Sequence, residues 1–423
     1  MDIYSFYMIV AGLFGFFMAW GIGANDVSNA MGPSVGSGAL SMKQAVCIAA
    51  IFEFLGTMLA GGSVTATIRS SIINPHLYIQ TPLVFVHGML AALLAAGCWL
   101  LFASKKGWPV STTHTIVGAL IGFGLVTKGF GSVQWICLLN IVSCWILSPI
   151  IGGILAFLLA SSVKLWIIDQ TNPIEQAKRY LPLYVFLMCF IMSMVTLIKG
   201  LDNLHIDLSF LSASLYSALL SFIVMLIAYY RLSKMYEVSK DRSMVLARVE
   251  KTFASLMIFM ACAMAFAHGS NDVSNAIGPL AAIYGIILNH GMMHSDAIVP
   301  FWILLVGGIG IVAGLMMFGK KVILTVGSEI TALSPSSGFC VSLATASTVI
   351  ICTGLALPIS TTQTLIGAVI GVALAHGTKA LHFETIKKII HSWIITLPAG
   401  ALMAILFYAL LHGFFDGLLH AKL

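Results

Sequence analysis

The sequence has few charged residues. Asp, Glu, Lys and Arg make up 9% of its 423 residues, hydrophobic residues make up 59%, and the mean hydropathy is +1.02. A chain with so little charge cannot cover the surface of a water-soluble globule. Apolar stretches of about 18 to 25 residues recur along its whole length, and a helix of that length crosses the hydrocarbon core of a bilayer. We therefore expect lipid to surround most of the folded chain.

Several other sequence features are absent, and each absence excludes a kind of protein or segment. No segment of about 10 residues alternates apolar and polar positions as a transmembrane barrel strand does. The first apolar stretch, 3–20, has no basic n-region and no small-residue cleavage site, so we expect it to remain as a helix. Eight cysteines lie singly in apolar runs without a CxxC pair, which indicates packing. The net charge of +6 is dispersed over loops, so nucleic acid is not an expected partner.

Hydropathy predicts an all-α polytopic membrane protein with about 12 transmembrane helices. Seven precede the one strongly charged stretch and five follow it, with approximate ranges of 3–20, 44–62, 83–103, 109–127, 133–160, 184–200, 208–230, 253–268, 300–318, 338–357, 359–376 and 389–412. The Gly-rich segments 20–40 and 267–290 are ambiguous between half-helices and re-entrant turns.

The basic residues are placed asymmetrically. If the N-terminus lies outside, seventeen of the 21 Lys and Arg residues fall in cytoplasmic loops, and the exceptions are Arg69, Lys128, Lys199 and Lys422. The positive-inside rule then places both termini outside and makes 231–251 a short cytoplasmic link between a first half, 1–230, and a second half, 252–423. The charges of this link are most simply a solvated face, and a lipid-headgroup or regulatory role is the alternative.

Two motifs occur twice in the same order. GIGANDVSNAMGP at 21–33 recurs as AHGSNDVSNAIGP at 267–279, with nine of thirteen positions identical. PVSTTHTIVGALIG at 109–122 recurs as PISTTQTLIGAVIG at 358–371, with nine of fourteen identical. The spacing from the first motif to the second is 86 residues in one half and 89 in the other, so chance is excluded as the cause.

The odd number of helices before the link predicts that the second repeat starts from the opposite side of the membrane. Inverted-topology repeats are typical of secondary transporters, whose binding site lies at the repeat interface on interrupted helices. Alternating access needs such symmetry and an enzyme rarely does. We therefore expect a transporter with its site between the two repeats.

The first motif places carboxylates and amides beside glycines in apolar sequence. A buried Asp costs several kcal/mol unless it is neutralised, so an intramembrane pair indicates function. Carboxylate, amide and unwound backbone oxygens suit Na⁺ or a proton. The alternative is a polar lock between helices. Glycines Gly21, Gly23 and Gly269 lie beside these groups. The candidates for the cation are Asp26, Asn29, Asp272 and Asn275, and the candidates for contact with the transported anion are Asn25 and Asn271.

The second motif predicts two helix starts that bind an anion. Pro fits the first turn, Ser or Thr caps it, and the free N–H groups with the positive dipole end attract negative charge. Alone, each run would be an ordinary cap. Two opposed runs can surround a tetrahedral oxyanion, and their residues are Pro109, Ser111, Thr112 and Thr113 in one repeat and Pro358, Ser360, Thr361 and Thr362 in the other.

Three further polar residues are ambiguous. His114 follows the first hydroxyl run, where it can carry a proton, contact the anion or act as a structural donor, and Gln363 takes the equivalent place in the second repeat. Glu53 is a lone carboxylate in an apolar helix, either a coupling-ion or proton group or an interface hydrogen-bond partner. Two Asp carboxylates and a divalent oxyanion would place about four negative charges in one low-dielectric site, so bound cations are required.

The sequence from Gly23 and its partner from Gly269 resemble the inorganic phosphate transporter family, also called type III sodium-phosphate cotransporters. The likeness extends to the paired Ser-Thr-Thr segments and to 319–339. It implies symport of inorganic phosphate with Na⁺ or H⁺, homodimers, no resident cofactor or structural metal, and phosphate and cations bound between the duplicated motifs. The short link resembles bacterial members, which implies a bacterial inner membrane. Some relatives carry metal-phosphate or resemble sulfate permeases.

Two departures from the family pattern affect titratable groups. Many relatives have a His after both Ser-Thr-Thr segments, whereas this chain has Gln363 after the second. Some relatives also have a Glu in each half. This chain has Glu53 in the first half, but Ser342 occupies the equivalent position in the second. The coupling ion and its stoichiometry therefore do not follow from the resemblance. The competing hypotheses are a sulfate carrier, a membrane-embedded hydrolase, for which no nucleophile, base and orienting acid occur together, and a receptor without transport.

Overall fold

The computed structural model describes residues 3–61, 72–199, 208–235, 241–289, 299–354, 359–377 and 381–420. Its long helices are α1 (Ile3–Gly36), α2 (Met42–Ala60), α4 (Pro82–Lys106), α5 (Thr112–Lys128), α6 (Trp135–Val163), α7 (Pro173–Lys199), α8 (Phe210–Ser233), α9 (Arg242–Asp272), α10 (Ser274–Leu288), α11 (Phe301–Leu324), α12 (Pro335–Gly354), α13 (Thr361–His376) and α14 (Phe383–His420). Short helical segments are η1 (Pro75–Tyr78), η2 (Phe130–Ser132), η3 (Lys164–Ile168) and η5 (Thr325–Glu329).

The prediction of an all-α membrane protein is confirmed. In the described part of the chain, ten segments are long and apolar enough to cross a membrane, with α9 and α10 counted as one, and α13 is a shorter apolar helix. Eleven of the twelve predicted helices overlap one of these segments, and the twelfth, 109–127, overlaps α5. Within the strongly charged stretch 231–251, residues 231–233 belong to α8 and residues 242–251 belong to α9.

Helix α1 differs from the sequence expectation of a break at the first motif. It runs without interruption from Ile3 to Gly36 through the whole Gly-Ala-Asn-Asp segment. The glycines serve close packing instead, because a Cβ atom at Gly23 would overlap the backbone carbonyl of Ile311 in α11. In the second repeat the helix axis is interrupted only at Val273, between α9 and α10.

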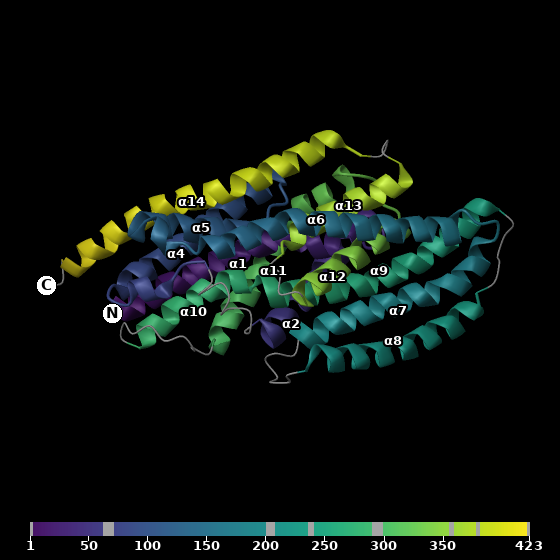
Figure 1. Ribbon diagram of the computed structural model, residues 1–423, viewed down its shortest axis with the longest axis horizontal. Coiled ribbons are helices and arrows are strands. Elements are labelled where there is room, and N and C mark those ends of the chain that lie inside the picture. Colours follow the sequence, from purple (N-terminus) through teal and green to yellow (C-terminus); the bar gives the residue numbers. More distant parts are fainter. Residues whose placement is uncertain are drawn as a thin grey trace.

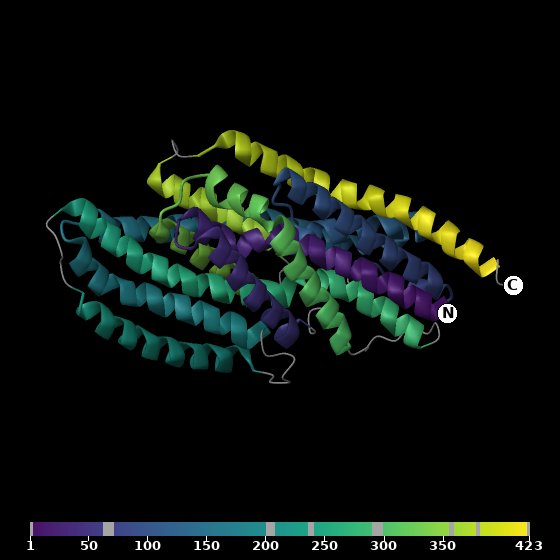
Figure 2. The same ribbon diagram turned by 180° about the vertical axis from the view of Figure 1, so that it is seen from behind.

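The helices form an elongated bundle with both termini at one end (Figure 1). Helices α7, α8 and α9 extend to the other end, where α8 ends and α9 begins (Figures 1 and 2). The termini and the described parts of the link, 231–235 and 241–251, therefore lie at opposite ends of the molecule.

Helices of the two sequence halves interlock rather than form separate bodies. Helix α1 packs along α11, and α9 packs along α2. In the same way α5 packs on α14, and α13 packs on α6. Glycines permit these contacts at equivalent repeat positions, because a Cβ atom at Gly118 or Gly367 would meet the backbone of α14 or α6, respectively. Each repeat is thus completed by helices of the other.

The outer faces of several helices expose large apolar side chains. On α8, Leu211, Leu215 and Leu219 are spaced four residues apart and are 70, 63 and 61% exposed. A row of exposed leucines on one helix face is a liability in water and is favourable against lipid. The polar residues of the two motifs lie on the inside of the bundle.

Candidate functional site

The two Ser-Thr-Thr runs cap helices that begin inside the molecule. The backbone N–H of His114 donates to Ser111 Oγ at the start of α5, and that of Gln363 donates to Ser360 Oγ at the start of α13, both at 3.3 Å. All four residues are buried. The predicted capping is confirmed, although Pro109 lies two residues before the cap rather than in the first turn. Pro358 lies outside the described residues.

Asp26 and Thr112 form the first pair of the site. Thr112 donates from Oγ1 to Asp26 Oδ2 at 2.6 Å, within one repeat. The same hydroxyl accepts from the Asn275 amide, which belongs to the other repeat, at 3.2 Å. Thr112 therefore joins a carboxyl group of α1 to an amide of α10.

Asn29 makes the reciprocal contact. Its amide donates to Thr362 Oγ1 at 2.9 Å and to Thr361 Oγ1 at 3.3 Å. Asn29 and Asn275 are repeat partners, and each donates to a hydroxyl run of the opposite repeat. The two motifs thus exchange equivalent contacts, as expected for a site shared between repeats.

Asn25 and Asn271 have different environments despite their equivalent sequence positions. The Asn25 amide donates to the Trp108 carbonyl at 2.9 Å and to Ser104, and its carbonyl accepts from the Val110 N–H at 3.0 Å. Asn25 therefore holds the segment that leads into α5. Asn271 is half-buried and donates to Asp272 of its own motif.

His268 lies between two carboxylates and was missed in the sequence interpretation. Its Nδ1 is 3.0 Å from Glu53 Oε1 of α2, and its Nε2 is 3.0 Å from Asp272 Oδ2. Gly269 allows α2 and α9 to approach, because a Cβ atom there would overlap the Glu53 backbone. The sequence does contain a sign of this residue: His268 is a polar residue at a position where the first copy of the motif has the apolar Ile22.

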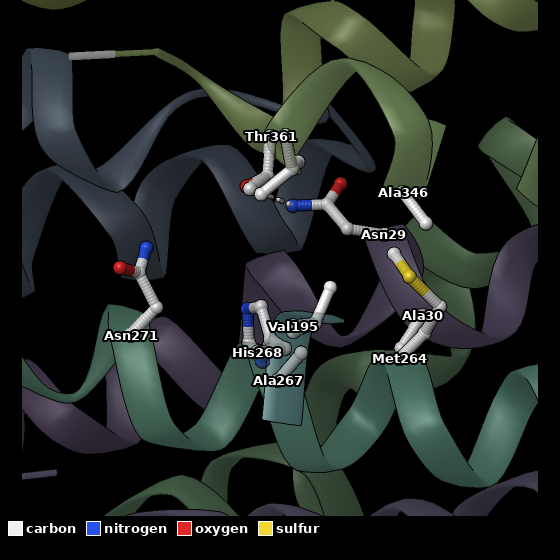
Figure 3. Close-up of a pocket in the computed structure, with 10 residues that line it drawn as sticks. Asn29, Ala30, Val195, Met264, Ala267, His268, Asn271, Ala346 and Thr361 are labelled. Atoms are coloured by element: carbon white, nitrogen blue, oxygen red, sulfur yellow. Dashed lines mark hydrogen bonds between the residues drawn. The ribbon is translucent and has the colours of Figure 1, made fainter. Parts of the chain in front are cut away.

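A small cavity lies beside these groups. Its volume is about 30 Å³, and its polar lining includes Asn29, His268, Asn271 and Thr361. Figure 3 shows Asn29 directed at Thr361 on one side, with His268 and Asn271 on α9 opposite them. Met264 contributes to the apolar part of the wall. The cavity therefore lies between Thr361 of the second hydroxyl run and His268 and Asn271 of α9.

His114, Gln363 and Thr113 lie at the edge of the site. The His114 ring stacks on Trp145 of α6, with ring centroids 3.5 Å apart. The His114 ring and the Gln363 side chain are both buried, and the two side chains interact with each other. Thr113 is half-buried. The two repeat-equivalent side chains, His114 and Gln363, are thus both enclosed beside the helix starts.

The centre is suited to cations and to an oxyanion together. Asp26, His268 and Asp272 offer ligand atoms within 4.8 Å of one another. Asp26 Oδ1 and Asn29 Oδ1 are buried oxygens with no hydrogen-bond donor within the described ranges. Both oxygens can coordinate a Na⁺-like cation, and the Asp26 carboxylate can also hold a proton. The hydroxyls and helix N-termini suit a negatively charged oxygen.

Comparison with known proteins gives consistent results. The chain matches the Phosphate transporter family over residues 22–404. It is 48% identical over 413 residues to a Haemophilus influenzae protein named as a phosphate permease, covering 97% of this chain and 98% of that protein. It is 40% identical over 422 residues to the Arabidopsis thaliana chloroplastic inorganic phosphate transporter 2-1, covering 93% of this chain and 70% of that protein.

A solved structure is also similar. It is described as the sodium-dependent phosphate transporter, and it superposes with a TM-score of 0.86 at 37% sequence identity. The similarity covers 96% of this chain and 99% of that chain. Relatives with such names are transporters rather than enzymes, in agreement with the sequence prediction of a carrier.

Proposed function

Because the chain belongs to the phosphate transporter family, we propose that it is a secondary active transporter that moves inorganic phosphate together with a cation, Na⁺ or H⁺, by alternating access. The observation that supports this proposal is the buried centre in which Asp26, Thr112 and Asn275 connect the two repeats. Coupling requires anion and cation groups in one site, and this centre contains both.

The proposal includes inverted symmetry between the repeats. The reciprocal contacts of Asn29 and Asn275 support it, as do the equivalent glycines Gly118 and Gly367 at exchanged helix contacts. A pair of interlocked repeats can rock against each other and open the shared site to one side at a time. The division into 1–230, 231–251 and 252–423 remains a prediction within this proposal.

We assign phosphate to the region between the two hydroxyl runs and the small cavity. Thr361 and Asn271 line that cavity, and the N-terminus of α13 adds partial positive charge. Ser111 and Ser360 contribute indirectly by fixing the N-terminal turns of α5 and α13, since their hydroxyls already accept hydrogen bonds from backbone N–H groups. Asn25 acts by positioning the entry to α5.

We assign the coupling cation to the carboxylates. Asp26 and Asp272 lie close enough to contact one ion, and Asn29 and Asn275 add amide oxygens nearby. The similarity to a structure described as sodium-dependent favours Na⁺. His268 supports the alternative of H⁺, because an imidazole between Glu53 and Asp272 can accept a proton.

Uptake into proteoliposomes tests the proposal. Labelled phosphate should accumulate against its gradient when Na⁺ is higher outside, and it should not accumulate without a cation gradient. Accumulation driven by a pH gradient in Na⁺-free buffer would identify H⁺ instead. Absence of accumulation under both gradients would refute coupled transport.

The variant Asp26→Asn should lose coupled uptake. The variant Asp169→Asn, which changes an acidic residue outside the site, should retain it.

Sulfate is the control anion for the identity of the substrate. Phosphate at neutral pH can donate a proton to a carboxylate and sulfate cannot, so excess sulfate should compete poorly. Strong competition by sulfate would favour a sulfate carrier.

Assembly and location remain part of the proposal. The family resemblance implies a homodimer, and the short link implies a bacterial inner membrane. The placement of the basic residues predicts that both termini lie outside and that the basic link lies in the cytoplasm. The placement of the termini and the link at opposite ends of the bundle is compatible with this orientation (Figure 1).

A further inference from the structure

A second polar cluster lies far from the transport site, at the end of the molecule that carries both termini. It comprises Tyr7 of α1, His87 of α4, and His412 and Asp416 of α14. None of these residues belongs to either repeated motif. Tyr7 and His87 are 1% exposed, whereas the side chains of His412 and Asp416 are 38% and 45% exposed. The cluster therefore has a fixed inner part and an accessible outer part.

The two imidazole rings converge on one point. His87 Nδ1 and His412 Nδ1 are 3.1 Å apart. Two imidazole nitrogens bound to one Zn²⁺ at about 2.0–2.1 Å in a tetrahedral site lie about 3.3 Å apart. With no metal bound, one N–H proton between the rings satisfies both nitrogens. A divalent ion that replaces this proton would need little movement of either ring.

The outer nitrogens of both rings contact oxygen groups. His87 Nε2 is 2.7 Å from the Tyr7 hydroxyl, and His412 Nε2 is 3.4 Å from Asp416 Oδ2. Histidines that bind metals usually donate their second N–H to a carboxylate, carbonyl or other oxygen, which fixes the ring and the tautomer. Tyr7 provides this partner for His87. Asp416 contacts the His412 nitrogen that faces away from His87, so its exposed side chain must turn toward the paired Nδ1 atoms to act as a ligand. This movement is short, since a ligand atom of Asp416 and one of each histidine lie within 4.8 Å of one another.

Aromatic packing holds the inner part of the cluster in place. Phe415 stacks on the His87 ring at 5.0 Å between centroids with an interplanar angle of 12°, and it stacks on Tyr7 at 4.4 Å. Tyr408 stacks on His412 at 5.3 Å. The rings are therefore oriented before any ligand arrives, which reduces the cost of binding.

We propose that His87, His412 and Asp416 form a binding site for a divalent transition metal ion of the Zn²⁺ class, with Tyr7 as the outer partner of His87. Two imidazoles and one carboxylate are a donor set that suits Zn²⁺ and similar ions better than Mg²⁺ or Ca²⁺. Water from the exposed side completes the coordination. A bound ion ties α14 to α4 at the end that carries the termini.

Zinc titration of the purified full-length chain in detergent, after treatment with a chelator, tests the proposal. Calorimetry should show one saturable Zn²⁺ equivalent per chain, and Zn²⁺ should raise the melting temperature. The variants His412→Gln and Asp416→Asn should each lose this site. They are the informative changes because both side chains are partly exposed, so the fold should tolerate them better than a change at buried His87.

Matched controls locate the ion. His391→Gln changes an exposed histidine on the same helix, α14, and should bind Zn²⁺ as the original chain does. Asp272→Asn changes the central carboxylate group, and it should also retain the Zn²⁺ equivalent. Tyr7→Phe should keep the site with about 10- to 100-fold weaker affinity, the usual effect of removing an outer-shell partner.

The proposal is refuted if the original chain shows no saturable Zn²⁺ binding. It is also refuted if His412→Gln and Asp416→Asn bind Zn²⁺ as tightly as the original chain. In either case the cluster would be only a hydrogen-bonded chain from Tyr7 to Asp416. Loss of binding in Asp272→Asn alone would assign the ion to the central site and contradict the proposal.

Discussion

At the residue scale, Thr112 connects the two repeats through a single hydroxyl. It donates to Asp26 and accepts from Asn275. Thr112→Val keeps the shape and removes both contacts, so phosphate uptake should fall, whereas Thr112→Ser should retain most of it. A hydrogen bond to a charged group contributes about 1.5–3 kcal/mol, which corresponds to roughly a 10- to 100-fold loss in apparent affinity or rate. Initial rates of labelled phosphate uptake measure this.

Thr115 is the matched control for that experiment. It lies on the same helix, is also buried, and its hydroxyl donates only to the Ser111 carbonyl at 2.9 Å. Thr115→Val should therefore leave uptake within about twofold of the original rate, because an intrahelical side-chain bond contributes little to helix stability. Equal losses in both valine variants would show that Thr112 acts only in packing.

Glu53 and His268 provide a second prediction at this scale. Both are almost completely buried and lie 3.0 Å apart. Removing one member of a buried pair leaves the other without compensation, typically at a cost of about 3–5 kcal/mol. Glu53→Gln and His268→Gln should each lower the melting temperature strongly. The double variant should be more stable than the sum of the two losses predicts.

Thermal unfolding of the four proteins in one detergent completes this double-variant cycle. Strict additivity of the two changes would mean that the residues contribute independently. The comparison does not depend on transport, so it separates the structural role of the pair from any role in proton coupling.

Sequence comparison alone could predict part of the central site. The duplicated motifs indicated that Asp26 and the hydroxyl runs meet, because two repeats that share one site must bring equivalent residues together. His268 was missed because its repeat partner is the apolar Ile22, so a search for duplicated polar residues passes over it. The cluster of His87 and His412 was also not predictable, since these residues lie 325 positions apart and follow no motif.

At the element scale, glycines determine how closely α1 and α11 approach. A Cβ atom at Gly23 would overlap the Ile311 carbonyl, and one at Gly314 would overlap the Trp20 carbonyl. Gly23→Ala should therefore destabilise the protein by at least the roughly 1–3 kcal/mol typical of overpacking. Gly12 lies on the same helix, but a Cβ atom there would meet no neighbouring heavy atom within 4 Å.

Gly12→Ala is the matched control for Gly23→Ala. Since alanine is the better helix former by about 1 kcal/mol, Gly12→Ala should leave stability unchanged or slightly raised. Melting temperatures of the two variants measure the difference. Equal behaviour would mean that α1 and α11 can separate at little cost.

The helix positions could be predicted from the sequence, but the role of these glycines could not. Helix positions followed from hydropathy, because long apolar runs have few alternatives in lipid. The continuity of α1 did not follow, since glycines beside Asn25 and Asp26 suggest a helix break when the partner helix is unknown. Only the contact with α11, a helix almost 300 residues further along the chain, reveals that these glycines are packing positions.

At the scale of the whole molecule, the arrangement of the helices is compatible with the orientation that the basic residues predict. Seventeen of the 21 basic residues were assigned to one side, and the end of α8 and the start of α9, which belong to the basic link, lie at the end opposite the termini (Figure 2). An even number of crossings requires the termini to share a side. The proposed metal cluster lies at the end of the termini, so this orientation would expose it outside the cell.

Cysteine labelling tests that orientation. Ser5 lies near the start of α1 and Ser233 at the end of α8, and both are exposed. In a Cys47→Ser background, which removes the exposed native cysteine, a membrane-impermeant maleimide should label Ser5→Cys in intact spheroplasts. It should label Ser233→Cys only in inverted vesicles, because the positive-inside rule keeps the basic link in the cytoplasm. The parent Cys47→Ser chain sets the background, and its phosphate uptake confirms that it folds. Labelling of both positions from one side would contradict the arrangement of the helices, whereas a reversed pattern would contradict only the orientation.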